Sequence, residues 1–195
     1  MESNGQISRR EALSRVAILL GGAISAPTLA GVLDAATRRA WATAQGWTPR
    51  TLNASQTEFV AVIAEHIIPE TDTPGARAAG VHRFVDTLLT DHYATAERDR
   101  FLAGLAGVDT QARSRHGKPF AESATEQQLA LLRDLDAAAY AAGRGEDTWF
   151  FRRMKELTLV GYYTSEIGAM QELHVSPFGT YRGDIPYTAV GRAWA

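Results

Sequence analysis

Residues 81–89 read Val81-His82-Arg83-Phe84-Val85-Asp86-Thr87-Leu88-Leu89, and their apolar side chains recur at helical spacing. Counted from the first valine, these side chains occupy positions i, i+3, i+4, i+7 and i+8, which lie on one face of an α-helix. The stretch therefore predicts an amphipathic helix that buries this face.

The same period recurs through most of the chain after residue 44, with turn residues between the apolar stripes. Asn53 and Gln56 are three residues apart, a spacing that lets their side chains satisfy the free backbone donors at a helix start. Pro69 ends that helix. Further helices are predicted over roughly 96–116, 123–142 and 148–160. No stretch alternates apolar and polar residues over the length of a buried strand. The predicted fold is all-α, a small bundle of about five helices.

The chain divides into three predicted parts: an export signal with its following segment at 1–44, the helical bundle at 45–161, and an irregular C-terminal arm at 162–195. Glycine and proline recur too often in the arm for long elements. Disordered tails are poor in aromatic residues, whereas this arm contains Tyr162, Tyr163, Phe178, Tyr181, Tyr187 and Trp194. We expect the arm to pack on its own bundle or on a partner protein.

Arg9 and Arg10 precede a charge-free run from Val16 to Leu33, a combination typical of a twin-arginine export signal. Such signals are read by a translocation receptor and carry folded proteins to the periplasm. Small residues at 28–30 and at 42–44 offer two possible cleavage sites. The alternatives are a general secretory signal and an uncleaved signal that keeps the chain at the membrane; the glycines and proline in the run argue against a permanent span.

Composition excludes several classes of function. The chain has no cysteine, so disulfides, thiolate metal sites and a cysteine-linked lipid anchor are impossible. After residue 44 there are 15 basic and 19 acidic side chains, a net charge of −4 without a basic cluster. This charge argues against nucleic acid as a partner.

Motifs for catalysis are scarce. The five histidines lack the paired helical spacing of metal ligands, and the glycine-rich nucleotide-binding loops and the Gly-x-Ser-x-Gly nucleophile motif are missing. Glu70 and Asp72 could form an acid/base pair, but a solvated turn explains them better. Glu166 is surrounded by aromatic residues, and we expect a buried structural hydrogen bond rather than catalysis. We therefore predict no catalytic, cofactor-binding or metal-binding residue in this chain.

Trp149, Phe150 and Phe151 are consecutive on a predicted helix and so point in three directions. Either at least one of them is exposed as an anchor for a partner, or the helix is covered by the C-terminal arm. The candidate partner interface comprises Trp149, Phe150, Phe151, Tyr162, Tyr163, Glu166, Phe178 and Tyr181.

Two long, irregular blocks carry a family resemblance: IIPETDTPGA at 67–76 and KELTLVGYYTSEIG at 155–168. With the Arg9-Arg10 pair they resemble the gluconate 2-dehydrogenase subunit 3 family. The resemblance implies an accessory subunit of a flavin-dependent sugar or polyol dehydrogenase of the glucose-methanol-choline type. FAD would then lie in the large partner subunit, a cytochrome c subunit would be a further partner, and the large subunit would cross the membrane as the passenger of the small one.

The leading hypothesis from the sequence is thus a non-catalytic subunit that stabilises and exports a dehydrogenase. Two alternatives stay open. One is an envelope enzyme in its own right that uses Glu166 or the Glu70 and Asp72 pair, and the other is a stand-alone helical binding protein.

Overall fold

The computed structural model describes residues 24–34, 46–141, 148–174, 186 and 188. All regular elements in these residues are helical, which confirms the all-α prediction. The α-helices are α2 (Ala26–Leu33), α4 (Ala54–Ile67), α5 (Val81–Asp91), α6 (Thr95–His116), α7 (Thr125–Tyr140) and α8 (Trp149–Thr164). A short 3₁₀ turn, η1 (Phe120–Glu122), precedes α7, and a π-helical segment, η3 (Ile167–Glu172), follows α8.

The first two helices of the bundle begin and pack as the sequence predicts. The amide of Gln56 donates to Asn53 Oδ1 over 2.8 Å, and the amide of Asn53 donates to Gln56 Oε1 over 2.9 Å, so the predicted cap is present. In α5 the predicted stripe is fully buried, at 0% exposure for Val81, Phe84, Val85, Leu88 and Leu89. Each fully buried side chain of this kind contributes roughly 1.5–3 kcal/mol.

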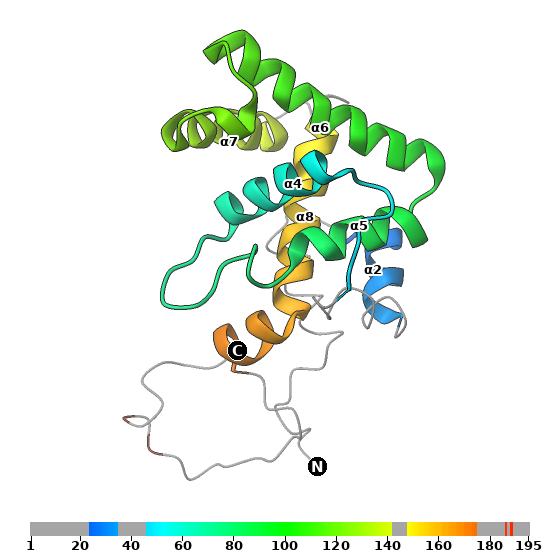
Figure 1. The fold of residues 1–195 in the computed structure, drawn as a ribbon. Coiled ribbons are helices and arrows are strands. Elements are labelled where there is room, and N and C mark those ends of the chain that lie inside the picture. Colours follow the sequence, from blue (N-terminus) through cyan, green and yellow to red (C-terminus); the bar gives the residue numbers. More distant parts are fainter. Residues whose placement is uncertain (1–23, 35–45, 142–147, 175–185, 187, 189–195) are drawn as a thin grey trace.

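Helix α8 runs through the middle of the bundle, and every other α-helix that the structure describes packs against it (Figure 1). Two glycines allow this close packing. A side chain at Gly104 of α6 would overlap the ring of Phe150, and one at Gly161 would come within 2.7 Å of the ring of Phe84. The glycine-rich sequence of α6 thus permits a close helix contact at one of its two glycines.

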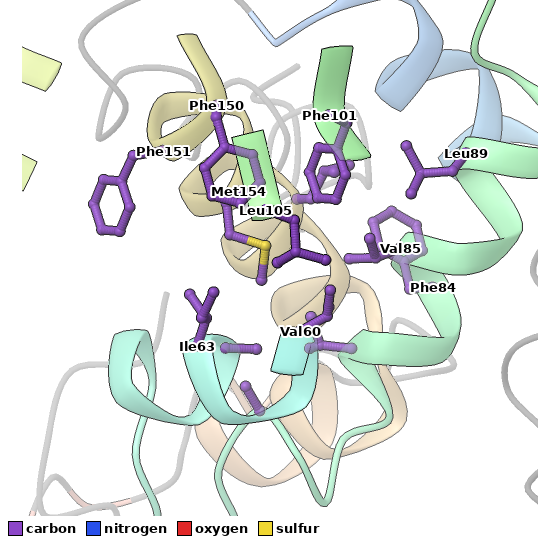
Figure 2. Close-up of a cluster of buried hydrophobic side chains, with 14 of the residues drawn as sticks. Val60, Ile63, Phe84, Val85, Leu89, Phe101, Leu105, Phe150, Phe151 and Met154 are labelled. Carbon is purple, nitrogen blue, oxygen red and sulfur yellow. The ribbon is translucent and has the colours of Figure 1, made fainter. Parts of the chain in front are cut away.

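The core is one continuous apolar cluster to which α2, α4, α5, α6, α7 and α8 all contribute, and Figure 2 shows its part between α4, α5, α6 and α8. Phe101 and Phe150 lie with their ring centroids 5.1 Å apart, and Met154 fills the space beneath them with 0% exposure. This cluster fixes the positions of the loops that connect the four helices.

Three boundaries differ from the prediction. Helix α8 continues to Thr164 and η3 follows it, so the first residues of the predicted arm, at 162–172, are largely helical. The helix predicted over roughly 123–142 spans Thr125–Tyr140, and Ser123 lies before it with its Oγ donating to the carbonyl of Pro119 over 3.0 Å. The third difference is α2, which lies inside the predicted export signal.

Several predicted features lie outside the described residues: Arg9 and Arg10, the cleavage site at 42–44, and Phe178 and Tyr181 of the arm. Within the described residues, none of the helices combines the length and the apolar character required to cross a bilayer.

Candidate functional site

The loop that follows α4 is held in one shape by Glu65. Its Oε1 accepts a hydrogen bond from the amide of Glu70 over 2.9 Å, and its Oε2 accepts one from the amide of Arg77 over 2.8 Å. The amide of Ala76 donates to the carbonyl of Ile68 over 2.9 Å and closes the loop. Gly75 is required, because a side chain there would overlap the Glu65 carboxylate. Residues 68–76 therefore form a fixed loop.

This loop is joined to the end of α8 by Tyr162. The tyrosine is 1% exposed, and its hydroxyl donates to the carbonyl of Pro74 over 2.9 Å. Beside it, Thr73 Oγ1 donates to Glu172 Oε2 over 3.1 Å. The two sequence blocks that resemble the subunit 3 family, at 67–76 and 155–168, thus meet in space. We call residues 68–76 and 162–172 together the loop–helix junction.

Ser165 and Gly168 turn the chain from α8 into η3. Ser165 Oγ donates to the carbonyl of Tyr162 over 2.6 Å and accepts from the amide of Gly168 over 3.0 Å. A side chain at Gly168 would overlap the carbonyl of Tyr162. π-helical turns are rare and are frequently found at functional sites. The tight turn places η3 directly beside the loop.

The exposed residues of the loop–helix junction include three carboxylates and one large apolar side chain. Glu70, Asp72 and Glu166 are exposed, and Met170 is 40% exposed. Burial raises the pKa of the half-buried Tyr163, and Glu172 and Tyr162 raise it further. Tyr163 therefore stays protonated at neutral pH and can donate a hydrogen bond. This arrangement can present carboxylates, a phenol and a methionine to a partner in fixed positions.

The structure exposes all three candidate acids, Glu166, Glu70 and Asp72. Glu166 is exposed, which corrects the expectation that it makes a buried structural hydrogen bond; the turn at Ser165 directs it outward. Asp72 Oδ1 accepts from Thr71 Oγ1 over 3.0 Å within the exposed part of the loop. Both acids of the pair are thus on the solvent side of the loop.

The aromatic side chains predicted as an interface divide between the core and the surface. Phe150 and Phe151 are only 6% and 4% exposed and belong to the core, as Tyr162 does, so they are corrected from partner contacts to packing residues. Trp149 is half-buried, with the guanidinium groups of Arg100 and Arg153 at 4.5 and 5.3 Å from its ring. Of the three consecutive aromatics, only Trp149 is partly open to solvent.

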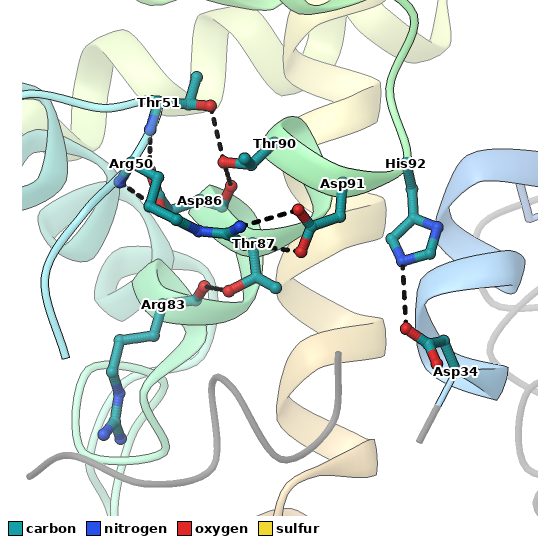
Figure 3. A network of polar contacts seen from close by, with 9 residues as sticks. All are labelled: Asp34, Arg50, Thr51, Arg83, Asp86, Thr87, Thr90, Asp91 and His92. Carbon is teal, nitrogen blue, oxygen red and sulfur yellow. Dashed lines mark hydrogen bonds and ion pairs between the residues drawn. The ribbon is translucent and has the colours of Figure 1, made fainter. Parts of the chain in front are cut away.

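A second polar cluster, which the sequence analysis did not predict, surrounds Asp86 of α5 (Figure 3). This carboxylate is 0% exposed and accepts from the amides of Arg50, Thr51 and Leu52 over 2.8 to 2.9 Å. Arg50 also forms a two-pronged ion pair with Asp91 on the surface. Asp86 holds the segment that enters the bundle, so its role is structural. The only sequence signal was an acid next to a buried valine.

The histidines have separate structural environments. His66 Nε2 contacts Gln128 Oε1 over 2.7 Å, and His92 Nε2 lies 3.9 Å from Asp34 Oδ2. Burial, together with Arg83 and Arg77, lowers the pKa of His82 to about 4. In the part of the chain that the structure describes, no three histidine or acidic side chains are grouped as a metal site would require.

Comparison with known proteins adds one finding. Residues 54–182, more than half of the chain, match the model of the family described as gluconate 2-dehydrogenase subunit 3. The match includes α4 to α8 and the whole loop–helix junction. No curated protein and no solved structure matches the chain.

Proposed function

Because this chain belongs to the gluconate 2-dehydrogenase subunit 3 family, we propose that it is the non-catalytic small subunit of a periplasmic FAD-dependent sugar or polyol dehydrogenase complex. In this proposal the large subunit, of the glucose-methanol-choline type, holds the flavin and carries out the oxidation. A cytochrome c subunit is a further partner. The small subunit stabilises the large one and supplies the twin-arginine signal, Arg9 and Arg10, for the pair.

The loop–helix junction is the observation that supports this role most directly. Its inner side is built from contacts of the half-buried Glu65 and of the buried Tyr162 and Gly168, which hold the backbone in place without any substrate. Its outer side ends in the exposed carboxylates of Glu70, Asp72 and Glu166 and in Met170. A surface that is ordered in advance binds a protein partner at a lower entropic cost. The junction is thus suited to recognition.

The chemistry of the exposed side indicates what the partner surface should offer. Exposed carboxylates at Glu70, Asp72 and Glu166 call for lysine or arginine on the partner. Met170 among them is flexible and apolar and suits a shallow hydrophobic pocket. We expect a partner surface with a basic rim around an apolar centre.

The visible spectrum of the purified complex tests the partnership. The chain, tagged and expressed in its native host, should co-purify with a protein that has flavin absorption, and haem bands would identify the cytochrome subunit. Met170→Glu should reduce the recovered flavin severalfold. Tyr140→Glu is the control, because Tyr140 on α7 is similarly exposed at 44%. A parent chain that purifies without flavin would refute the proposed complex.

Export is tested separately with arginine-to-lysine pairs. The double change Arg9→Lys and Arg10→Lys should keep both this chain and the dehydrogenase in the cytoplasm, because the receptor reads the paired guanidinium groups. The matched control is Arg38→Lys with Arg39→Lys, the second arginine pair of the N-terminal segment. Equal periplasmic activity in the two double variants would refute export of the dehydrogenase by this signal.

A further inference from the structure

Helix α2 comes from the apolar run of the predicted signal, yet one of its faces is part of the core. Thr28 is 0% exposed and Val32 is 2% exposed, whereas their neighbours Leu29 and Leu33 are 39% and 59% exposed. The helix packs against α5 and α8 (Figure 1). Gly31 allows the contact: a side chain there would come within 2.7 Å of Leu88 Cδ1 and 3.2 Å of His92 Cδ2.

Both ends of α2 are also attached to the bundle by polar groups. At its start, the amide of Ser25 donates to Oε1 of the buried Glu156 over 2.8 Å, and the Ser25 hydroxyl caps the helix through the amide of Thr28. At its end, Asp34 Oδ2 faces His92 Nε2 at 3.9 Å (Figure 3). The position of α2 on the bundle is thus fixed by close packing, a helix cap and two polar contacts.

Such a fit is not expected of a segment that is discarded. Removal of α2 would expose Leu88 and would leave the buried Glu156 without the Ser25 amide. The possible cleavage site at 28–30 lies inside the helix, with Thr28 fully buried. Proteases cut accessible, flexible backbone, so the folded chain protects this site.

We infer that residues 24–34 are retained in the exported protein as a structural helix, and that any removal of the signal occurs before Ile24. This inference rests on the proposed export of the chain. The functional signal is then confined to the residues before α2. Any part of the signal that is not cleaved off stays attached to the bundle through α2. Cleavage at 42–44 is excluded as well, because it would cut α2 from the chain.

Mass spectrometry of the exported protein decides where the chain begins. The full chain, with a C-terminal tag, is expressed in its native host and recovered from the periplasmic and membrane fractions. An N-terminus at or before Ile24 is expected. An N-terminus at Gly31 or Gln45, or anywhere else after Ile24, overturns the inference. If the whole chain stays in the cytoplasm, the proposed export fails and retention in an exported protein fails with it, whereas the structural role of α2 is decided by the stability of the variants below.

Neighbouring positions on α2 provide a matched pair of variants. Val32→Asp and Leu33→Asp add the same charge to α2 at adjacent positions, so an effect shared by both variants reports on the charge and a difference between them reports on burial. Only Val32 is buried, and Val32→Asp should lower the Tm by about 5 °C or more, against less than about 2 °C for Leu33→Asp. Should Val32→Asp fail to fold, Val32→Ala and Leu33→Ala replace the pair, with an expected difference of about 3 °C. Equal melting temperatures within the pair that is measured would overturn the structural role of α2.

Discussion

Two segments without regular secondary structure are each held by one carboxylate from a neighbouring helix, and the two carboxylates differ in exposure. Asp86 is fully buried and binds three amides of the entry segment, residues 46–52. Glu65 is half-buried and binds the amide of Glu70 in the loop at 68–76 and the amide of Arg77 directly after it. The entry segment is held by a carboxylate inside the protein. The loop is held by a carboxylate on its inner side, so its outer side stays exposed to solvent. The first arrangement serves stability, and the second leaves side chains exposed for the proposed contact with a partner.

Loss of the buried carboxylate should have the largest effect. Asp86→Ala leaves three amides without an acceptor, and we expect the free energy of unfolding to fall by about 3–5 kcal/mol. Urea denaturation followed by circular dichroism measures it. Asp91→Ala is the control: its ion pair with Arg50 is exposed and is worth less than about 1 kcal/mol. Similar losses in the two variants would contradict the special role of the buried site.

The loop should be sensitive to a single methyl group. In Gly75→Ala the new side chain overlaps the Glu65 carboxylate, which cannot move without releasing the amides of Glu70 and Arg77. We expect a loss of about 1–3 kcal/mol together with weaker binding of the dehydrogenase. Gly107→Ala is the control, because no atom lies within 4 Å of the added group. Unchanged stability in Gly75→Ala would show that the loop adapts.

Glu65→Ala separates stability from recognition. Two hydrogen bonds to partly exposed amides are lost, which should cost about 1–2 kcal/mol, less than for Asp86→Ala because water can replace the carboxylate. Partner binding should suffer more than stability, since the loop loses its fixed shape. Calorimetric titration of the variant with the large subunit, beside a thermal melt, gives both quantities. A larger loss of stability than in Asp86→Ala would reverse the comparison.

His82 lies between the two segments and should add a small pH dependence. Its ring is 5.7 Å from that of Trp47 in the entry segment, and Arg77, which follows the loop, helps to lower its pKa to about 4. The unfolded chain binds a proton near pH 6.5 and the folded chain only near pH 4, so stability falls as the pH decreases between these values. Because the ring is partly exposed, we expect a loss on the order of 1 kcal/mol.

Unfolding measured at pH 7 and pH 4.5 tests this dependence. His82→Gln should remove that part of the pH dependence, whereas His116→Gln, at the end of α6, should leave it intact. An unchanged pH profile in His82→Gln would assign the titration to another group.

Helical period and turn residues were sufficient to predict the bundle. The stripe of α5 and the cap at Asn53 depend on residues a few positions apart, so the sequence determines them locally. The burial of Phe150 and Phe151 could not be predicted. It depends on the close packing of α6 at Gly104 against the start of α8, which the local sequence does not show. Position on a helix indicates where a side chain points but not what covers it.

The candidate site was partly predictable. The resemblance singled out both blocks of the loop–helix junction, but their contact depends on Tyr162 reaching Pro74 across 88 positions of sequence. Likewise, Asp86 bonds to amides 34 to 36 positions away, which no local pattern reveals. Apolar character alone also could not distinguish a leader from a packed helix at α2.

The position of α8 at the centre of the bundle has a consequence for synthesis on the ribosome. The helix around which the others pack begins at Trp149, so α4, α5 and α6 are made before the surface that covers them exists. The faces that pack against α8 therefore stay uncovered by it until translation has passed Thr164. On the proposed route, the export signal at Arg9 and Arg10 leaves the ribosome first, whereas the helical domain completes its fold last. Translocation of the folded protein must therefore follow the end of translation.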